Sequence, residues 1–262
     1  MSDDGPMQVP GPSDVDIAGD APAGSPDDQR FARRVTSFRA RRSTISDRQQ
    51  AIWDARWPEL GRQALPEDAA DGLLDTDAWF GRRAPLVLEI GCGTGTSTLA
   101  MAQEEPGIDV IAVEVYRRGL AQLLAAIDRE HVTNIRLVRG DGVDVLTRML
   151  PPASLTGVRV FFPDPWPKSR HHKRRLLQPD TVALIADRLR PGGVLHAATD
   201  HQGYAGHIAE VGDAEPRLRR VAWDTGDTDR AGLPILTARP VTKYERKALA
   251  GTDVAELVWV RT

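Results

Sequence analysis

Three acidic residues stand within or directly after apolar segments that are typical of buried strands. Glu89 interrupts the segment 86–90, Glu114 ends the segment 109–114, and Asp141 follows the segment 134–138. Burying a carboxylate is unfavourable unless it is paired or hydrogen-bonded, so we expect Glu89 to have a polar partner. At the ends of their strands, Glu114 is placed to accept hydrogen bonds from ribose hydroxyls and Asp141 to reach an adenine amino group.

A glycine-rich turn lies between the first two of these segments. Gly91, Gly93 and Gly95 have the spacing G-x-G-x-G, and a helix is predicted to begin near Thr96. Glycines there let the backbone turn sharply and approach a ligand at a helix N-terminus, although a tight turn without a ligand is the simpler interpretation. Dinucleotide enzymes carry G-x-G-x-x-G at the same place. The surrounding carboxylates favour S-adenosylmethionine over NAD, because they suit a sulfonium and an ammonium group and repel a pyrophosphate.

A stiff loop follows the apolar segment 158–162. It reads Pro163-Asp164-Pro165-Trp166-Pro167-Lys168, with three prolines in five residues. Proline fixes φ, and open α/β sheets bind ligands at the carboxyl ends of their strands. We therefore expect Asp164 and Lys168 to project beside the cofactor. The alternative is a solvated turn in which Trp166 fills part of the core.

A cationic run comes directly after this loop and consists of Arg170, His171, His172, Lys173, Arg174 and Arg175. Such a run is often only a solvated helix face. Beside a stiff loop it could bind an anionic backbone, because phosphate contacts position a polynucleotide without reading its sequence. The two histidines have no Cys or acid suitably spaced beside them, so we predict no metal site.

The net charge of −3 conceals an uneven distribution. Residues 1–29 contain seven acids and no Lys or Arg, and removing those seven charges from −3 leaves +4 for residues 30–262. The next stretch is basic and carries a few apolar anchors, Phe38 among them. It could order on a partner as an arm, with the candidate RNA contacts Arg33, Arg34, Arg39, Arg41 and Arg42.

The elements that must position these residues alternate along the chain. Strands are predicted at 86–90, 109–114, 134–138, 158–162 and 194–199, with helices between them and closing strands at 221–223 and 255–260. Strands alternating with helices of this length predict βαβ units and an open, mostly parallel sheet covered on both faces. An earlier helix is expected to begin after Ser46 or Asp47 and to end before Pro58.

Taken together, these motifs resemble the bacterial tRNA (guanine-N7)-methyltransferase family. The resemblance rests on the string 163–168 with its cationic run and the loop 88–95, and on three further strings: Glu114-Val115-Tyr116, Ala198-Thr199-Asp200 and Thr242-Lys243-Tyr244-Glu245. It covers about Phe38 to the C-terminus. It implies an α/β class I methyltransferase fold: a Rossmann-like, seven-stranded, mostly parallel sheet with its last strand antiparallel and helices on both faces.

The resemblance also implies roles for individual residues. Glu89, Glu114, Asp141 and Asp164 would line the S-adenosylmethionine pocket beside the glycines, with Asp164 also catalytic. The substrate guanosine would be held by Lys168, Asp200, Thr242, Lys243, Tyr244 and Glu245, and Arg170 through Arg175 would contact RNA. Ser169, Gly142 and Tyr244 depart from the family's commoner lysine, alanine and phenylalanine. Helix capping is the alternative for Asp200 and for Glu245 with Thr242.

The implied reaction transfers a methyl group to N7 of guanine 46 in the tRNA variable loop and leaves S-adenosylhomocysteine. N7 already bears a lone pair, so catalysis would be alignment plus electrostatics, with no strong base. A carboxylate can accept both N1–H and N2–H of guanine, which would suit Asp200 or Glu245. Three alternatives stay open: a methyltransferase of the same fold acting on a small molecule or protein, a non-catalytic RNA-binding module with a vestigial pocket, and a nicotinamide oxidoreductase.

Composition sets the organisation and the compartment. Residues 1–29 are expected to be a disordered acidic tail, 30–60 a basic arm with the first helix, and 61–262 the methyltransferase domain. A single cysteine, Cys92, fits a reducing compartment, and neither a membrane span nor a secretion signal is apparent. We therefore expect a cytoplasmic protein with tRNA as its partner, no metal and no membrane, as a monomer or a homodimer.

Overall fold

The structure is a computed structural model of the whole chain, and it describes residues 38, 44–65, 72–221, 232–240 and 253–262. All of these belong to one compact unit, residues 35–262. The predicted tail, the arginines predicted to clamp RNA (Arg33, Arg34, Arg39, Arg41 and Arg42) and the predicted substrate segment Thr242, Lys243, Tyr244 and Glu245 lie outside the described residues.

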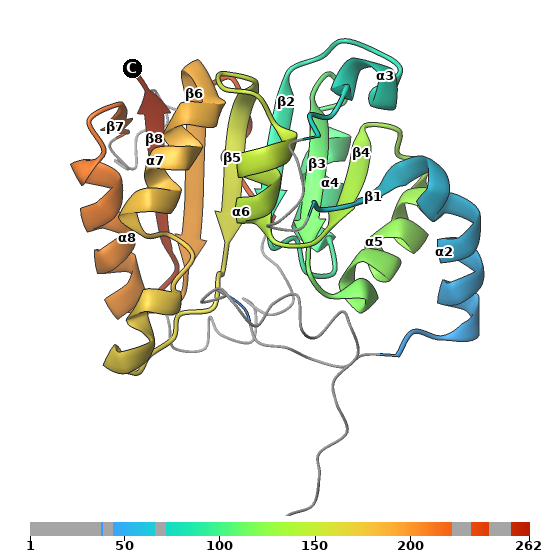
Figure 1. Cartoon of the computed structure of the whole chain (residues 1–262), viewed down its shortest axis with the longest axis horizontal. Coiled ribbons are helices and arrows are strands. Elements are labelled where there is room, and N and C mark those ends of the chain that lie inside the picture. Colours follow the sequence, from blue (N-terminus) through green and yellow to red (C-terminus); the bar gives the residue numbers. More distant parts are fainter. Residues whose placement is uncertain (1–37, 39–43, 66–71, 222–231, 241–252) are drawn as a thin grey trace, which may run out of the picture. The chain divides into compact units, whose positions relative to one another are not determined.

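The centre of the fold is an eight-stranded sheet in the order β1-β4-β3-β2-β5-β6-β8-β7 (Figure 1). Pairing is parallel from β1 through β6 and antiparallel at β8 and β7. The strands are β1 (Gly61–Gln63), β2 (Leu86–Ile90), β3 (Asp109–Glu114), β4 (Ile135–Arg139), β5 (Leu155–Phe161), β6 (Leu189–Thr199), β7 (Leu218–Arg220) and β8 (Ala255–Arg261). The expected α/β architecture of the class I methyltransferases, mostly parallel with an antiparallel end, is confirmed.

Three strand predictions need correction. The sheet has eight strands rather than seven, because the short β1 pairs with β4, and its sequence Gly61-Arg62-Gln63 carries no apolar pattern that would announce a strand. The strand predicted at 194–199 begins at Leu189 and continues through Pro191-Gly192-Gly193, with a register irregularity against β5. The sequence predicted a strand at 221–223, whereas the described strand is Leu218–Arg220, which pairs with the end of β8; of the predicted range only Val221 lies within the described residues.

Helices cover both faces of the sheet. They are α2 (Asp47–Leu60), α3 (Thr76–Phe80), α4 (Thr96–Glu104), α5 (Arg117–Glu130), α6 (Gly142–Asp144), the π-helical turn η1 (Val145–Met149), the 3-10 helix η2 (Ser169–Arg174), α7 (Pro179–Arg188) and α8 (Gln202–Ala214). One core cluster joins the sheet to η1, α7 and α8, and another joins it to α2, α4 and α5. Because both faces are buried, the central strands are nearly continuous apolar runs. Among the described helices, none has the length and hydropathy needed to cross a bilayer.

The first helix begins at a predicted cap but ends later than predicted. Ser46 caps α2 in a reciprocal capping box with Gln49, as one of the two predicted caps. The helix does not stop before Pro58 but continues to Leu60, and the Gly61 N–H still donates to the Trp57 carbonyl. A proline in the last turn removes one backbone hydrogen bond without preventing the turn from closing.

The sheet brings the ends of its central strands to one edge. In Figure 1 the arrowheads of β5 and β6 point to the lower edge of the sheet, and β2, β3 and β4 run parallel to them. From β2 the chain passes to β3 and β4 on one side and later to β5 and β6 on the other. The sheet therefore changes winding direction at β2, where open α/β sheets form a crevice.

Candidate active site

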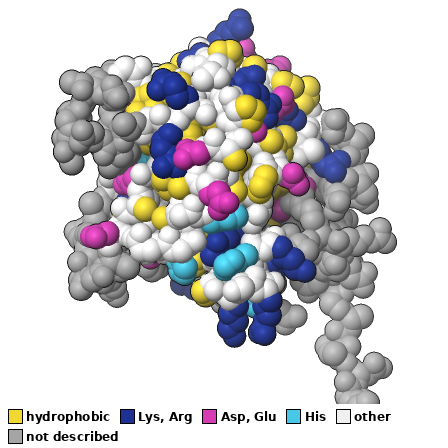
Figure 2. Space-filling model, turned by 90° about the vertical axis from the view of Figure 1, so that its left-hand side faces the viewer, with side chains coloured by type: hydrophobic (Ala, Val, Ile, Leu, Met, Phe, Trp, Pro, Cys, Tyr) yellow, Lys and Arg dark blue, Asp and Glu magenta, His cyan; other side chains and the backbone are white. Residues whose placement is uncertain are grey.

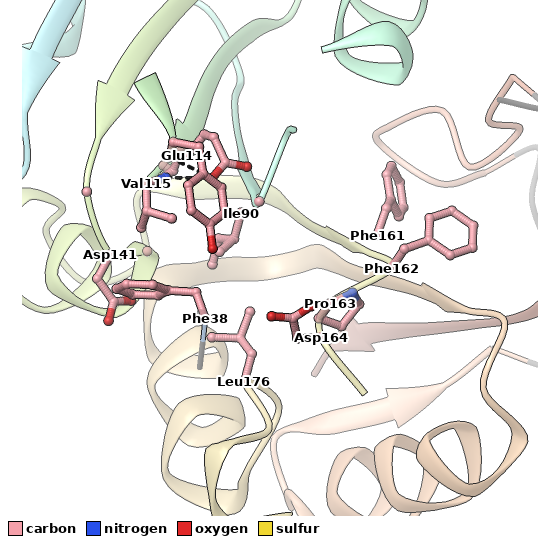
Figure 3. Close-up of a pocket in the computed structure, with 15 residues that line it drawn as sticks. Phe38, Ile90, Glu114, Val115, Asp141, Phe161, Phe162, Pro163, Asp164 and Leu176 are labelled. Carbon is pink, nitrogen blue, oxygen red and sulfur yellow. Dashed lines mark hydrogen bonds between the residues drawn. The ribbon is translucent and has the colours of Figure 1, made fainter. Parts of the chain in front are cut away.

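A cavity of about 160 Å³ lies at this crevice (Figure 3). Its walls come from the carboxyl ends of four strands, β2 to β5, and it is lined by Gly91 with the predicted carboxylates Glu114, Asp141 and Asp164. The structure thus gathers residues separated by up to 138 positions in the sequence, Phe38 and Leu176, around one space. Glu89, Gly93 and Gly95 are not among the residues that line the cavity.

The three glycines of the turn have different structural reasons. Gly91 and Gly93 have φ values of 78° and 56°, and a Cβ at either position would meet no atom of the described residues within 4 Å. Their backbone therefore faces open space, which a ligand can approach closely. Gly95 also has a positive φ, but a Cβ there would lie 2.5 Å from a Leu123 carbon, so close packing of α5 requires this glycine.

Glu114 ties the glycine loop to the end of β3. Its Oε2 accepts from the Gly93 N–H at 3.0 Å, and its Oε1 accepts from the Val115 and Tyr116 N–H groups at 2.7 and 3.0 Å. A carboxylate has about four lone-pair sites, so the three backbone donors leave room for about one ligand hydroxyl rather than two. Burial raises the pKa of Glu114, the three N–H groups oppose that rise, and the nearby charge of Asp164 adds to it.

Asp141 and Phe38 form the opposite side of the cavity. Asp141 caps α6, with its Oδ1 accepting from the Val143 N–H at 2.9 Å. The Phe38 ring lies beside the Asp141 side chain, with Leu176 below it (Figure 3). Sequence reasoning identified Phe38 only as an apolar anchor of the basic arm. Its presence here gives the cavity an aromatic wall close to a carboxylate.

Asp164 projects from the proline loop into the cavity (Figure 3). Phe162 and Trp166, two residues before and two residues after Asp164, have φ values of 50° and 45°. Non-glycine residues in this left-handed region cost about 1–3 kcal/mol each and persist only where the surroundings hold them. Trp166 is buried and Asp164 is half-buried at the cavity, so the loop combines the core contact and the projecting carboxylate that the two interpretations of the sequence offered separately.

Glu89 lies inside the fold rather than in the cavity. It pairs in register with Arg159 of β5 and is 2% exposed. Among the described residues its Oε2 makes no hydrogen bond, and neither does the buried hydroxyl of Thr98, which faces it. Burial raises the pKa of Glu89, while Arg159 and Thr98 oppose the rise. The expected polar partner of Glu89 is therefore the charged guanidinium of the neighbouring Arg159. A direct contact between Glu89 and the cofactor stays a prediction.

The cationic run has exposed and buried members. Lys168, Arg170 and Lys173 are exposed, while His171, His172 and Arg174 are half-buried. Figure 2 shows Lys, Arg and His side chains gathered at the lower end of the molecule. The two views differ by a rotation about the vertical axis, so this end is also the lower edge of the sheet in Figure 1. The exposed cations thus belong to the same edge as the cavity.

Arg175, the last residue of the run that was predicted to contact RNA, is buried. It is 5% exposed, its Nε donates to the Pro165 carbonyl at 3.0 Å, and its guanidinium lies over the Tyr204 ring at 4.8 Å. Burial raises the pKa of Tyr204 to about 12. The turn of η2 directs this last residue of the run inward, so the charge supports the loop and is not available at the surface.

Asp200 follows β6 at the same edge of the sheet and is exposed. The alternative role as a helix cap does not apply to it, because His201 caps α8 with its Nδ1 accepting from the Tyr204 N–H at 3.1 Å. Asp200 does not line the cavity.

The remaining cavity residues that sequence reasoning missed are mostly apolar. Val115 and Tyr116 directly follow Glu114, Phe162 precedes the proline loop, and Leu176 follows the cationic run. Each adjoins a motif that was recognised, so proximity in sequence was the available signal. Gly119 was also missed, although it does not line the cavity: a Cβ there would lie 2.2 Å from the Gly93 carbonyl oxygen, so the glycine lets α5 pack against the loop.

Comparisons with known proteins show which family the chain resembles. A sequence-family model described as a putative methyltransferase matches residues 83–256. A protein of Mycolicibacterium gilvum called tRNA (guanine-N(7)-)-methyltransferase is 79% identical over 237 residues, which cover 88% of each chain. A protein of the same name from Mycolicibacterium vanbaalenii is 73% identical over 100% of this chain and 99% of its own. Among solved structures, the 16S rRNA methyltransferase KamB aligns with 15% identity and a TM-score of 0.49, over 74% of this chain and 97% of its own.

Proposed function

This chain belongs to the tRNA (guanine-N7)-methyltransferase family, and we propose that it transfers a methyl group from S-adenosylmethionine to N7 of guanine 46 in the variable loop of tRNA, in the cytoplasm. The observation that carries this proposal is the shared edge: a cavity lined by Glu114, Asp141 and Asp164 opens where the exposed cations Lys168, Arg170 and Lys173 stand.

The donor set of the cavity fits S-adenosylmethionine. Three carboxylates suit a cofactor that carries positive charge and hydroxyl groups, and they repel a pyrophosphate. The open backbone at Gly91 and Gly93 leaves space where any side chain would intrude. Glu114 would take a ribose hydroxyl with its remaining acceptor site, and Asp141 would take the adenine amino group. When bound, the cofactor supplies an electrophilic methyl group.

The residues of this chain provide alignment and charge rather than a strong base. Guanine N7 has an available lone pair, so no proton has to be removed before the transfer. Positive charge develops on the purine during methyl transfer, and the Asp164 carboxylate in the cavity stabilises it. Because Asp164 stands on a proline-stiffened loop, its position changes little during the reaction.

The tRNA is held by the surface around the cavity. Arg170 and Lys173 contact phosphates, with His171, His172 and Arg174 beside them, and Lys168 holds the substrate guanosine. We do not extend the phosphate contact to the buried Arg175. Asp200 at the end of β6 accepts the N1–H and N2–H groups of guanine. The resemblance of the chain to the family also implies guanosine contacts for Thr242, Lys243, Tyr244 and Glu245, and RNA contacts for the arginines of the arm.

The test uses the purified full chain, labelled S-adenosylmethionine and two tRNA transcripts that differ only in guanine or adenine at position 46. We expect N7-methylguanosine in the first transcript and none in the second, with nucleoside analysis as the readout. Equal labelling of both transcripts would contradict the position, and absence of N7-methylguanosine from both would contradict the activity. Label in a small molecule or protein of a cell extract, with unlabelled tRNA, would favour the alternative methyltransferase.

A further inference from the structure

The loop that carries Asp164 is bounded by two residues in an unfavourable backbone conformation. Phe162 and Trp166, with φ values of 50° and 45°, stand two residues before and two residues after the carboxylate. Prolines at 163 and 165 stiffen what lies between, so the orientation of Asp164 is set by how these two residues are held. Residues in the left-handed region return to ordinary conformations unless neighbouring groups hold them there.

An arginine covers the first of these residues. The Arg239 guanidinium lies 4.8 Å from the centre of the Phe162 ring and 5.8 Å from that of Phe161. Its side chain is only 3% exposed and pairs with Glu256 at 3.0 Å. Glu256 in turn contacts His196 at 3.1 Å. Arg239 is therefore fixed from β8 and β6, and it presses on Phe162 from a rigid support.

A second arginine covers the other end of the loop. The Arg174 guanidinium lies 3.9 Å from the centre of the Trp166 ring, and Trp166 is 3% exposed. Arg174 Nη2 also donates to the carbonyl of Phe38, whose ring lines the cavity, at 3.3 Å. The two ends of the Asp164 loop thus have the same arrangement, a planar cation stacked on the aromatic ring of a left-handed residue.

We propose that Arg174 and Arg239 are positioning residues that hold Asp164 in the cavity by stacking on Trp166 and Phe162. For Arg174 this differs from the RNA contact expected of the cationic run. A phosphate contact needs a positive charge, which lysine also supplies, whereas stacking on a ring uses the planar guanidinium. Replacement by lysine therefore separates the two roles.

The experiment compares R174K and R239K with R170K, which alters an exposed arginine of the same run. Among the described residues Arg170 lies over no aromatic ring, and its Nε donates to His171 Nε2 at 3.3 Å. Three quantities are measured: the affinity for S-adenosylmethionine without RNA by calorimetry, the affinity for tRNA, and the single-turnover rate of methylation. We expect R174K and R239K to lower the rate by about tenfold or more and to weaken cofactor binding several-fold. Their tRNA affinity should stay within about twofold, and R170K should leave the cofactor affinity unchanged.

The rate measurement rests on the proposed function, but the calorimetry does not. If the wild type bound the cofactor and left tRNA unmethylated, the proposed function would fail while the cofactor affinities still tested the stacking. Wild-type cofactor affinity in R174K and R239K, or a loss confined to tRNA affinity, would overturn the inference. Thermal unfolding checks that each variant folds, and R174K decides alone if R239K does not, because Arg174 is half-exposed.

Discussion

Replacing Gly119 by alanine should disrupt the cofactor pocket without replacing any residue that lines it. Gly119 is the third residue of α5, where alanine is normally the better helix former. Its added Cβ would lie 2.2 Å from the Gly93 carbonyl oxygen and 2.9 Å from the Gly93 carbonyl carbon. Those atoms are backbone, so relief requires the loop or the helix to move as a whole.

The size of the effect follows from that contact. A close C···O approach is about 3.3 Å, so about 1 Å of movement is needed. Overpacking costs about 1–3 kcal/mol, and the helix preference of alanine returns about 1 kcal/mol, so stability should fall only slightly. The moved loop would also lose the hydrogen bond from the Gly93 N–H to Glu114, a bond to a charged group worth about 1.5–3 kcal/mol. If that loss falls on the bound state, cofactor affinity drops about 10- to 100-fold.

Calorimetric titration with S-adenosylmethionine measures this loss, and thermal unfolding shows whether the variant is folded. The matched control is Gly107→Ala, because a Cβ at Gly107 meets no atom within 4 Å in the part of the chain that the structure describes, and its φ is not in the left-handed region. The control should bind like the wild type and unfold at the same or a slightly higher temperature. A folded Gly119→Ala variant with wild-type affinity would refute the idea that the contact between α5 and the loop shapes the pocket.

Three further outcomes are expected. In Glu114→Gln only one oxygen remains to serve three N–H donors, so calorimetry should show at least about tenfold weaker cofactor binding, with the exposed Glu104→Gln unchanged. Burial raises the pKa of Glu89 above its ordinary 4.5, so the folded state binds the proton more tightly than the unfolded state. In denaturant titrations the wild type should therefore lose stability relative to Glu89→Gln as the pH rises from 4.5 to the folded pKa. Parallel pH profiles of the two proteins would contradict this. Replacing Arg170 or Lys173 by alanine should reduce the salt slope of tRNA binding by about 0.7–0.9 per residue in filter-binding assays, and an unchanged slope would count against a phosphate contact.

The sequence predicted the edge of the sheet on which the site lies because strand direction and strand ends follow from local patterns. Glu114, Asp141 and Asp164 each stand just beyond an apolar run, and parallel strands bring such positions together. Glu89 stands one residue before the end of its run, at Ile90, and pattern alone does not say whether such a carboxylate faces the ligand or the helices. The alternation of β2 turns it toward the core that contains α4 and α5, opposite Arg159.

Phe38 could not be assigned to the cavity because its neighbours in sequence carry no regular pattern. It precedes the first helix, and its position depends on a contact with Arg174, 136 residues later. Long-range contacts of this kind depend on the shape of the assembled surface, which periodicity does not encode. The short strand β1 was not predicted for a related reason: its pairing with β4 is specified by β4 rather than by its own residues.

The cationic run shows most clearly how exposure divides one sequence feature into separate tasks. Lys173 faces solvent, Arg174 stacks on Trp166, and Arg175 supports the Pro165 carbonyl from within. The formal charge of the run therefore overstates what an RNA backbone meets, and removing Arg174 or Arg175 would change loop geometry together with charge. A fall in tRNA affinity in those variants is evidence for a phosphate contact only if the salt slope falls with it, because displacement of Asp164 alone leaves the number of released counterions unchanged.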